Sequence, residues 1–220
     1  MISVFLLDDC AFSREGIQKY LACLEEVRLA AVCENEAQGL AHFSGERLPG
    51  PAVLLWRYDL ERAVAPVEWM KTRQPQDGFS QVVYRAPDDE GMATEMLAAG
   101  MAGYVVKGEP LERIREVLVT VARGETWVSP MLAPRLVTYV QRQTLDLLAL
   151  TEGERRVVPL LAEGLKNPVI AARLSLAEQS VKNTLCALRK KLDVWGRTEL
   201  VEKARELDAL IKLTNYTGGG

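Results

Sequence analysis

The sequence predicts an α/β fold, in which a doubly wound five-stranded parallel sheet is followed by an all-α domain of four helices. Two observations carry this prediction. Short apolar runs alternate with helical patterns throughout residues 1–123, and no strand pattern is found after residue 150. Because the chain has 220 residues and 48% of them are hydrophobic, it is long enough for two separate cores.

The five expected strands are nearly all-apolar, which is typical of a parallel sheet covered by helices on both faces. They are expected at residues 2–7, 27–33, 52–56, 81–84 and 103–106. The helices that alternate with them are expected near residues 11–22, 36–43, 63–72, 89–99 and 110–123. This alternation indicates one domain over residues 1–123.

The remaining residues divide into a linker, a helical domain and a tail. The stretch 124–149 contains two prolines and a helical pattern near residues 132–142, and it is interpreted as the linker. The helical domain is expected over residues 150–213 and a flexible tail over residues 214–220. The four helices of this domain are expected near residues 151–163, 167–174, 178–192 and 197–211.

Two of these helices begin with capping signals. Thr151 and Glu154 form a capping box, in which each side chain satisfies a free N–H group at the helix start. Asn167 precedes a proline at the first helical position and is expected to cap the next helix.

Charge is distributed unevenly along the chain, whose net charge is −3. Residues 1–123 hold 13 Lys and Arg against 19 Asp and Glu, whereas residues 150–220 hold 12 against 9. An acidic front and a basic rear indicate that only the rear meets a polyanion.

Cysteine and histidine are too sparse for a zinc site or a nucleophilic triad. The four cysteines form no C-x-x-C pair and the chain has a single histidine, so neither a metal, a cofactor nor an enzymatic activity is expected. No secretion signal and no apolar run of about 18 residues is recognisable, which favours a cytoplasmic protein without membrane contact.

The segment 178–192 carries the most functional information, because it has one apolar and one polar face. The apolar face is formed at helical spacing by Val181, Leu185, Leu188 and Leu192. The candidate DNA-binding residues lie outside it: Gln179, Lys182, Asn183, Cys186, Arg189 and Lys190. Amides pair with adenine edges and cations with phosphates or guanine, although any solvated amphipathic helix shows a similar outer face.

Residues 150–200 resemble the LuxR-type helix-turn-helix. The matching residues are Leu150, Thr151, Glu154, Arg155, Leu161, Ala162, Glu163, Gly164, Leu165, Asn167, Ile170, Ala171, Leu174, Val181, Lys182, Lys191, Leu192 and Arg197. The resemblance implies that segment 178–192 enters the major groove of double-stranded DNA and that the last helix joins two copies into a homodimer. It also implies base-facing positions for Lys182, Asn183 and Cys186, and phosphate contacts for Arg189 and Lys190.

The sequence departs from this family at three places. Ala177 stands where the family has a capping serine, a loss worth about 1 kcal/mol. Pro168-Val169 replaces Lys-Glu, and Thr184 replaces a histidine.

Charged residues follow the expected strands, beginning with Asp8 and Asp9 after the first. Paired acids at a sheet edge bind hard cations such as Mg²⁺, although solvated loop acids look the same. Lys107 closes the fifth strand. Together with the fivefold alternation, these residues resemble the flavodoxin-like receiver domain of a response regulator. The whole chain is thus similar to the NarL/FixJ class.

This resemblance implies a phosphate-accepting aspartate at the end of the third strand, where this chain has Arg57. A guanidinium is a permanent cation with no acceptor, and it pairs with carboxylates. Arg85 stands where the family has a hydroxyl that reads the phosphoryl group. The expected pocket of Asp8, Asp9, Arg57, Arg85 and Lys107 has a net charge of +1 and disfavours a divalent cation. We therefore expect an atypical receiver that is controlled independently of aspartate phosphorylation.

Three alternatives stay open. Asp59 lies two residues beyond Arg57 and would accept phosphate if the third strand ran longer. The weakened cap is also compatible with an adaptor that has lost DNA binding and regulates a partner protein. The cationic pocket, finally, could hold an anionic metabolite.

Overall fold

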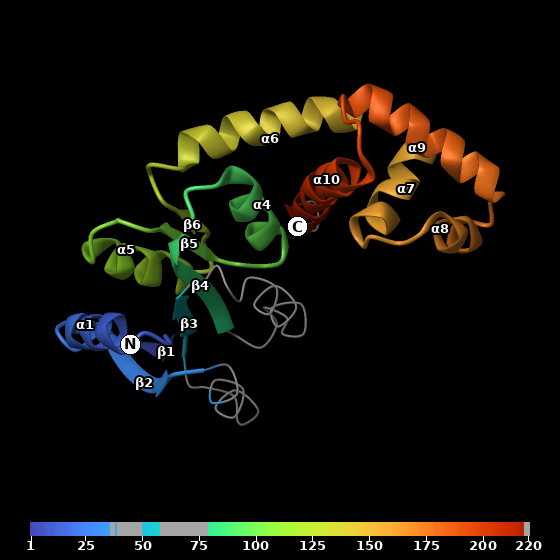
Figure 1. Cartoon of the computed structure of the whole chain (residues 1–220). Coiled ribbons are helices and arrows are strands. Elements are labelled where there is room, and N and C mark those ends of the chain that lie inside the picture. The colour runs from blue at the N-terminus through green and yellow to red at the C-terminus, as the bar shows by residue number, and fades with distance from the viewer. Residues whose placement is uncertain (36–37, 39–49, 58–78, 218–220) are drawn as a thin grey trace. The chain divides into compact units, whose positions relative to one another are not determined.

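The computed structural model describes residues 1–35, 38, 50–57 and 79–217 and divides the chain into two compact units. The first unit spans Met1–Pro134 and the second Arg135–Gly220 (Figure 1). The boundary thus falls inside the expected linker. The helices expected at 36–43 and 63–72 lie, apart from residue 38, outside the described residues.

The first unit is built on a parallel sheet with strand order β2-β1-β3-β4-β5-β6. Its strands are β1 (Ile2–Leu7), β2 (Val27–Cys33), β3 (Ala52–Arg57), β4 (Phe79–Ala86), β5 (Gly103–Val106) and β6 (Trp127–Val128). All neighbouring pairs are parallel, so the predicted doubly wound fold is confirmed. The near-continuous burial of β1, β3 and β5 explains why their sequences read as unbroken apolar runs.

The sixth strand was not predicted, because two residues are too few to show a strand pattern. Ser129 fixes it to the sheet, since its N–H donates to the Tyr104 carbonyl at 3.0 Å and its Oγ accepts from the Val106 N–H at 2.8 Å. The first part of the expected linker is therefore a strand of the first unit.

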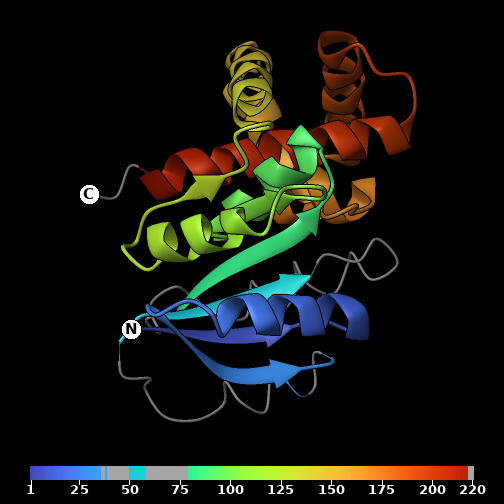
Figure 2. The same ribbon diagram turned by 90° about the vertical axis from the view of Figure 1, so that its left-hand side faces the viewer.

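Helices cover both faces of this sheet. Helices α1 (Ala11–Leu21) and α5 (Glu112–Val121) lie on one face, where Figure 2 shows them in blue and yellow-green, turned to the viewer. Their apolar residues pack with Val4, Leu6, Val53, Leu55 and Val82 in one buried cluster. Helix α4 (Glu90–Ala98) buries Ala93 and Met96 against the sheet's other side.

Strand β5 is tightly enclosed. A Cβ at Gly103 would lie 2.5 Å from Cγ2 of Val117, so only glycine allows α5 to approach this closely. Tyr104 is fully buried, and its hydroxyl donates to the Pro87 carbonyl at 2.8 Å.

The second unit contains the four predicted helices and a fifth, whose helical pattern near residues 132–142 was assigned to the linker. They are α6 (Ala133–Leu148), α7 (Glu152–Ala162), α8 (Asn167–Leu174), α9 (Glu178–Leu192) and α10 (Arg197–Thr217). The predicted core stripe of α9 is confirmed, because Val181, Leu185 and Leu188 are buried in a cluster shared with α7, α8 and α10. Helix α10 continues six residues past its expected end, since glycine first interrupts the chain at Gly218. The expected tail is thus helical from residue 214 to residue 217.

Helix α6 belongs to the helical unit and is not a loose linker. Gln143 is its one buried side chain among the described residues, and both of its amide atoms bind α10. Its Nε2 donates to Glu206 at 2.7 Å, and its Oε1 accepts from Lys203 at 2.9 Å. Lys203 also pairs with Asp146 of α6 at 3.0 Å. Because these contacts join distant residues through polar side chains, apolar periodicity could not reveal them.

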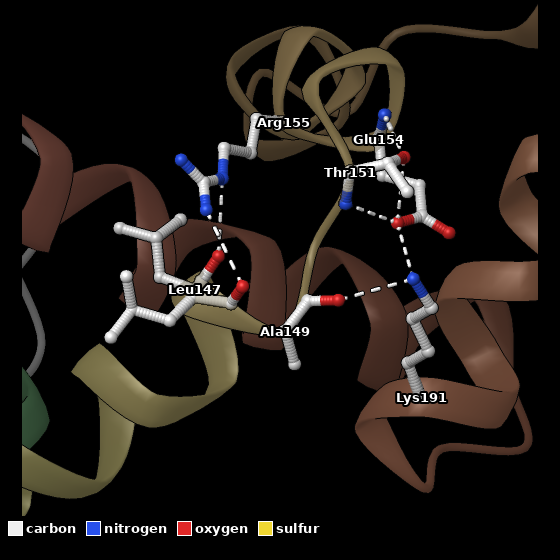
Figure 3. Close-up of polar contacts among 7 residues, drawn as sticks. Leu147, Ala149, Thr151, Glu154, Arg155 and Lys191 are labelled. Carbon is white, nitrogen blue, oxygen red and sulfur yellow. Dashed lines mark hydrogen bonds and ion pairs between the residues drawn. The ribbon is translucent and has the colours of Figure 1, made fainter.

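The predicted capping box at α7 is confirmed and extends to helix α9 (Figure 3). Glu154 Oε2 accepts from the Thr151 N–H at 2.7 Å and from the Lys191 ammonium at 2.7 Å. Lys191 also donates to the Ala149 carbonyl at 3.1 Å. One carboxylate therefore caps α7 and fixes the C-terminal end of α9 against it.

Asn167 does not cap α8, contrary to expectation. The N-cap is Lys166, and the side-chain Oδ1 of Asn167 instead accepts from Arg197 at 2.9 Å. The guanidinium of Arg197 also donates to the Leu165 carbonyl. The side chain of Asn167 thus connects the starts of α8 and α10, a long-range partner that local sequence rules cannot supply.

Glu154→Gln is expected to destabilise the helical unit by about 1.5–3 kcal/mol, because it removes the charge of a buried carboxylate that accepts from the Thr151 N–H and the Lys191 ammonium. Burial alone would raise the pKa of Glu154, but Lys191 and Thr151 outweigh it and lower this pKa below its ordinary 4.5. The stabilisation by the ionised Glu154 carboxylate is therefore fully present above pH 4.5. It is lost as the pH falls through the lowered pKa that Glu154 has in the folded protein. Hydrogen exchange of α7 and α9 amides in the full chain measures it.

Glu163→Gln is the matched control for this change, because Glu163 and Arg173 form an exposed ion pair at 2.8 Å. It should change exchange little and add no dependence on pH. Equal effects of the two substitutions would contradict the role given to Glu154.

Ala177→Ser is expected to stabilise α9 by about 1 kcal/mol. Ala177 has the extended backbone of an N-cap but makes no side-chain cap bond, as its sequence predicted. Slower exchange of the first α9 amides would show the gain. Ala172→Ser, at an exposed position inside α8, is the control and should bring no stabilisation.

Candidate functional sites

An arginine and two aspartates meet at the carboxyl end of the sheet in the first unit. Strand β1 pairs with β3 so that Leu7 lies opposite Trp56, which makes Asp8 and Arg57 neighbours across the strands. The Arg57 Nε lies 2.8 Å from Asp8 Oδ1 and 3.1 Å from Asp9 Oδ1, and a second guanidinium nitrogen also donates to Asp9. One guanidinium thus joins both acids of the expected pocket.

Tyr84 completes this cluster and was missed by sequence reasoning. It lies opposite Arg57 in the pairing of β3 with β4, and its hydroxyl donates to Asp8 Oδ2. The backbone N–H of Cys10 donates to Asp8 Oδ1 at 2.9 Å. The one sequence signal was that Tyr84, the last residue of the expected strand 81–84, carries a hydroxyl.

The surroundings keep both donors in their protonated forms. Burial by itself would lower the pKa of Arg57, but its hydrogen bond with Asp9 and the charges of both aspartates outweigh this and raise the pKa. The pKa of Tyr84 is raised, first by burial and then by its bond to Asp8. Arg57 therefore stays a cation and Tyr84 stays a donor at neutral pH.

Arg85 and Lys107 do not join this cluster, so the expected five-residue pocket is wrong for two of its members. Both side chains are exposed, and neither binds any residue in the described part of the chain. The pairing of β4 with β5 shifts register between Val83 and Ala86, and Arg85 has a left-handed backbone with φ 57°. This irregularity interrupts the alternation of side chains along β4, so the straight strand assumed from the sequence misplaced Arg85.

The cluster does not fit the divalent cation that a receiver domain would hold. The Arg57 guanidinium pairs with both carboxylates that would bind such an ion, and its charge opposes a second cation. Asp8 is buried, and each of its carboxylate oxygens already accepts a hydrogen bond. Among the residues described, no group of three or more metal-ligating side chains is found. Asp59 lies outside these residues.

The second unit presents a polar surface on α9. Gln179, Lys182, Asn183, Cys186 and Lys190 are exposed, opposite the buried apolar stripe. The Gln179 amide donates to Asn183 at 3.1 Å, and Lys182 pairs with Glu178 at 3.0 Å. The face therefore carries amides, a small thiol and cations in reach of solvent.

Arg189 differs from the other candidates because it is half-buried. Its Nε atom is inaccessible to solvent and has no hydrogen-bond partner in the described part of the chain. It lies on the flank of α9, beside Leu188, which belongs to the core. A helical wheel cannot show this, because burial there depends on neighbouring helices.

In the part of the chain that the structure describes, no helix is both long enough and apolar enough to cross a bilayer.

Comparisons with known sequences identify the helical unit and the whole chain. The family model "Bacterial regulatory proteins, luxR family" matches residues 148–204. "DNA-binding transcriptional activator DevR/DosR" of Mycobacterium tuberculosis is 30% identical over 210 residues, covering 94% of this chain and 95% of the relative. "Nitrate/nitrite response regulator protein NarL" of Escherichia coli K12 is 28% identical over 203 residues, covering 90% and 92%.

Solved structures share the fold. A structure of the response regulator RcsB from Salmonella typhimurium has a TM-score of 0.56 at 18% identity, and covers 91% of this chain and 98% of that one. "Structure of two RcsB dimers bound to two parallel DNAs" matches with a TM-score of 0.55 at 18% identity, covering 93% and 98%.

The family assignment rests on two observations: the order of the two units along the chain and the length over which relatives align with it. The parallel sheet and the helical unit follow each other along the chain as they do in the RcsB fold. The luxR-family match spans α7, α8, α9 and the start of α10, and the relatives align over nearly the full chain. The chain therefore belongs to the NarL family of DNA-binding transcriptional response regulators.

Proposed function

We propose that this protein is a transcriptional response regulator whose N-terminal unit is controlled without phosphorylation of an aspartate. The observation that carries the proposal is the pairing of Arg57 with Asp8 and Asp9. Arg57 stands at the end of β3, where the family's phosphate acceptor is expected. Its guanidinium has no lone pair available to attack phosphorus, and it is held against both acids.

Electrostatics also support control without phosphorylation of an aspartate. Receiver chemistry needs a divalent cation to neutralise the transferred phosphoryl group. Here the permanent charge of Arg57 already offsets one of the two negative charges of Asp8 and Asp9, without a bound ion. The side chain is only 20% exposed, so water screens this attraction less than it would on an open surface. The unit is thus held in one electrostatic state, and its control comes through another input, such as a regulatory protein partner.

The helical unit reads double-stranded DNA through α9. Lys182, Asn183 and Cys186 lie on its exposed face and are the residues for base edges. Lys190 serves a phosphate, and Arg189 has its guanidinium Nε buried, which restricts its reach. DevR/DosR is named a DNA-binding activator, and RcsB has been seen as dimers on DNA, which supports binding of this chain as a homodimer.

An adaptor without DNA binding is the second candidate, and the uncapped start of α9 at Ala177 favours it. Loss of one cap costs about 1 kcal/mol, which the apolar core of the unit offsets readily. The predicted salt dependence of DNA binding separates the two candidates.

Incubation of the full chain with acetyl phosphate and Mg²⁺ is expected to add no phosphoryl group, as measured by intact mass. The reason is that β3 ends in Arg57, which cannot accept phosphate, and that its charge opposes the metal ion. A stoichiometric adduct that disappears in Asp59→Asn would show an ordinary phospho-switch and would overturn the proposal. A well-studied receiver treated in parallel confirms that the phosphodonor is active.

Lys182→Ala is expected to weaken binding to a DNA site selected from a random duplex pool by about 5- to 100-fold, since each good base contact is worth about 1–3 kcal/mol. The Lys182–Glu178 pair is exposed and opposes this contact little. Affinity at several salt concentrations is the measurement, because counterion release makes binding fall steeply with salt.

Lys19→Ala, on the exposed surface of α1 in the first unit, is the matched control and should leave affinity unchanged. A pool that yields no enriched site, or affinity independent of salt, would favour the adaptor.

A further inference from the structure

The Asp8 carboxylate is held by one ion pair and two hydrogen bonds, from three parts of the chain. Arg57 of β3 and the Cys10 N–H, just before α1, bind Oδ1, and the Tyr84 hydroxyl of β4 binds Oδ2. Asp8 is only 1% exposed and Tyr84 2%. A buried carboxylate with both oxygens engaged is fixed in rotation, which is what an ion pair of defined geometry needs.

Tyr84 and Arg57 contact different carboxylate oxygens of Asp8. In the β3–β4 register Arg57 and Tyr84 are direct partners, so the sheet itself brings both donors to this carboxylate. Tyr84 points into the core cluster that also contains Val82, Leu6 and Leu55. Its hydroxyl therefore has no bulk water to exchange with, and Asp8 is its acceptor.

We propose that Tyr84 is a positioning residue that locks Asp8 to Arg57 and so keeps the acidic site closed to divalent cations. This inference rests on the proposed function and adds a second obstacle to the binding of a divalent cation. Arg57 supplies the opposing charge, and Tyr84 holds the Oδ2 oxygen that an incoming cation would need as a ligand. Replacing Arg57 alone therefore removes the opposing charge, but Oδ1 still accepts from the Cys10 N–H and Oδ2 from the Tyr84 hydroxyl.

Binding of Mn²⁺ to the full chain, followed by electron paramagnetic resonance, tests this with four proteins. The unmodified protein and Tyr84→Phe are expected to show no saturable binding at this site. Arg57→Asp is expected to bind weakly, and the double variant Arg57→Asp/Tyr84→Phe at least about tenfold more tightly, because a hydrogen bond to a charged group no longer competes with the ion. Asp8→Asn in the Arg57→Asp background measures binding elsewhere on the chain.

Tyr104→Phe is the matched control in the Arg57→Asp background. Tyr104 is as deeply buried as Tyr84, but its hydroxyl donates to a backbone carbonyl and not to Asp8. Tighter Mn²⁺ binding must appear with Tyr84→Phe and not with Tyr104→Phe, since mere loosening of the core affects both. Tyr84→Met removes the hydroxyl in a different shape and serves if the Phe variant does not fold.

Two results distinguish a failure of this inference from a failure of the proposed function. Equal Mn²⁺ affinity of Arg57→Asp with and without Tyr84→Phe would overturn the role of Tyr84 and leave the proposed function intact. Saturable Mn²⁺ binding by the unmodified protein that is lost in Asp8→Asn would overturn the proposed function and this inference with it.

Discussion

The ion pair between Asp8 and Arg57 is the constraint that orders the carboxyl end of the sheet in the first unit. Asp8 is buried at the end of β1, and a buried carboxylate without a partner costs several kcal/mol. In a receiver that partner would be a bound cation, which comes and goes. Here it is a side chain on the adjacent strand β3, which is present whenever the sheet is formed. Neutralisation of the acid is thus part of folding, and it no longer depends on a ligand.

Polar contacts between distant residues also order the second unit, where they orient the helices. Its apolar core drives the helices together, but such burial has no direction and leaves helix orientation loosely specified. Three polar contacts supply direction: Glu154 with Lys191, Asn167 with Arg197, and Gln143 with Lys203. They fix α9 to α7, α10 to α8 and α6 to α10. The exposed face of α9 is therefore presented in one orientation, as reading a groove requires, and α6 is part of the body that holds it.

Sequence reasoning was accurate where local chemistry decides and inaccurate where distant residues meet. The limits of α9, the capping box at Thr151 and the missing cap at Ala177 depend on a few neighbouring residues, and they were predicted. The placement of Arg85 failed because a shift in the pairing of two strands turned its backbone left-handed. Asn167 failed as a cap because Arg197, thirty residues away, claims its side chain. Tyr84 was overlooked because an apolar strand interior gives no sign that a hydroxyl there has a charged acceptor.

The sequence by itself determined the order of the elements, the two-part organisation and the identity of the residues at the end of each strand, because hydrophobic periodicity and capping act over a few residues. It also determined that a permanent cation, and not an acceptor, ends β3. Only the tertiary structure decided which charges meet. Arg57, Arg85 and Lys107 are alike in sequence as cations at strand ends, yet strand register joins one of them to Asp8 and leaves the other two in solvent. Register and bulges are set by the packing of the whole sheet, and no short stretch of sequence contains that information.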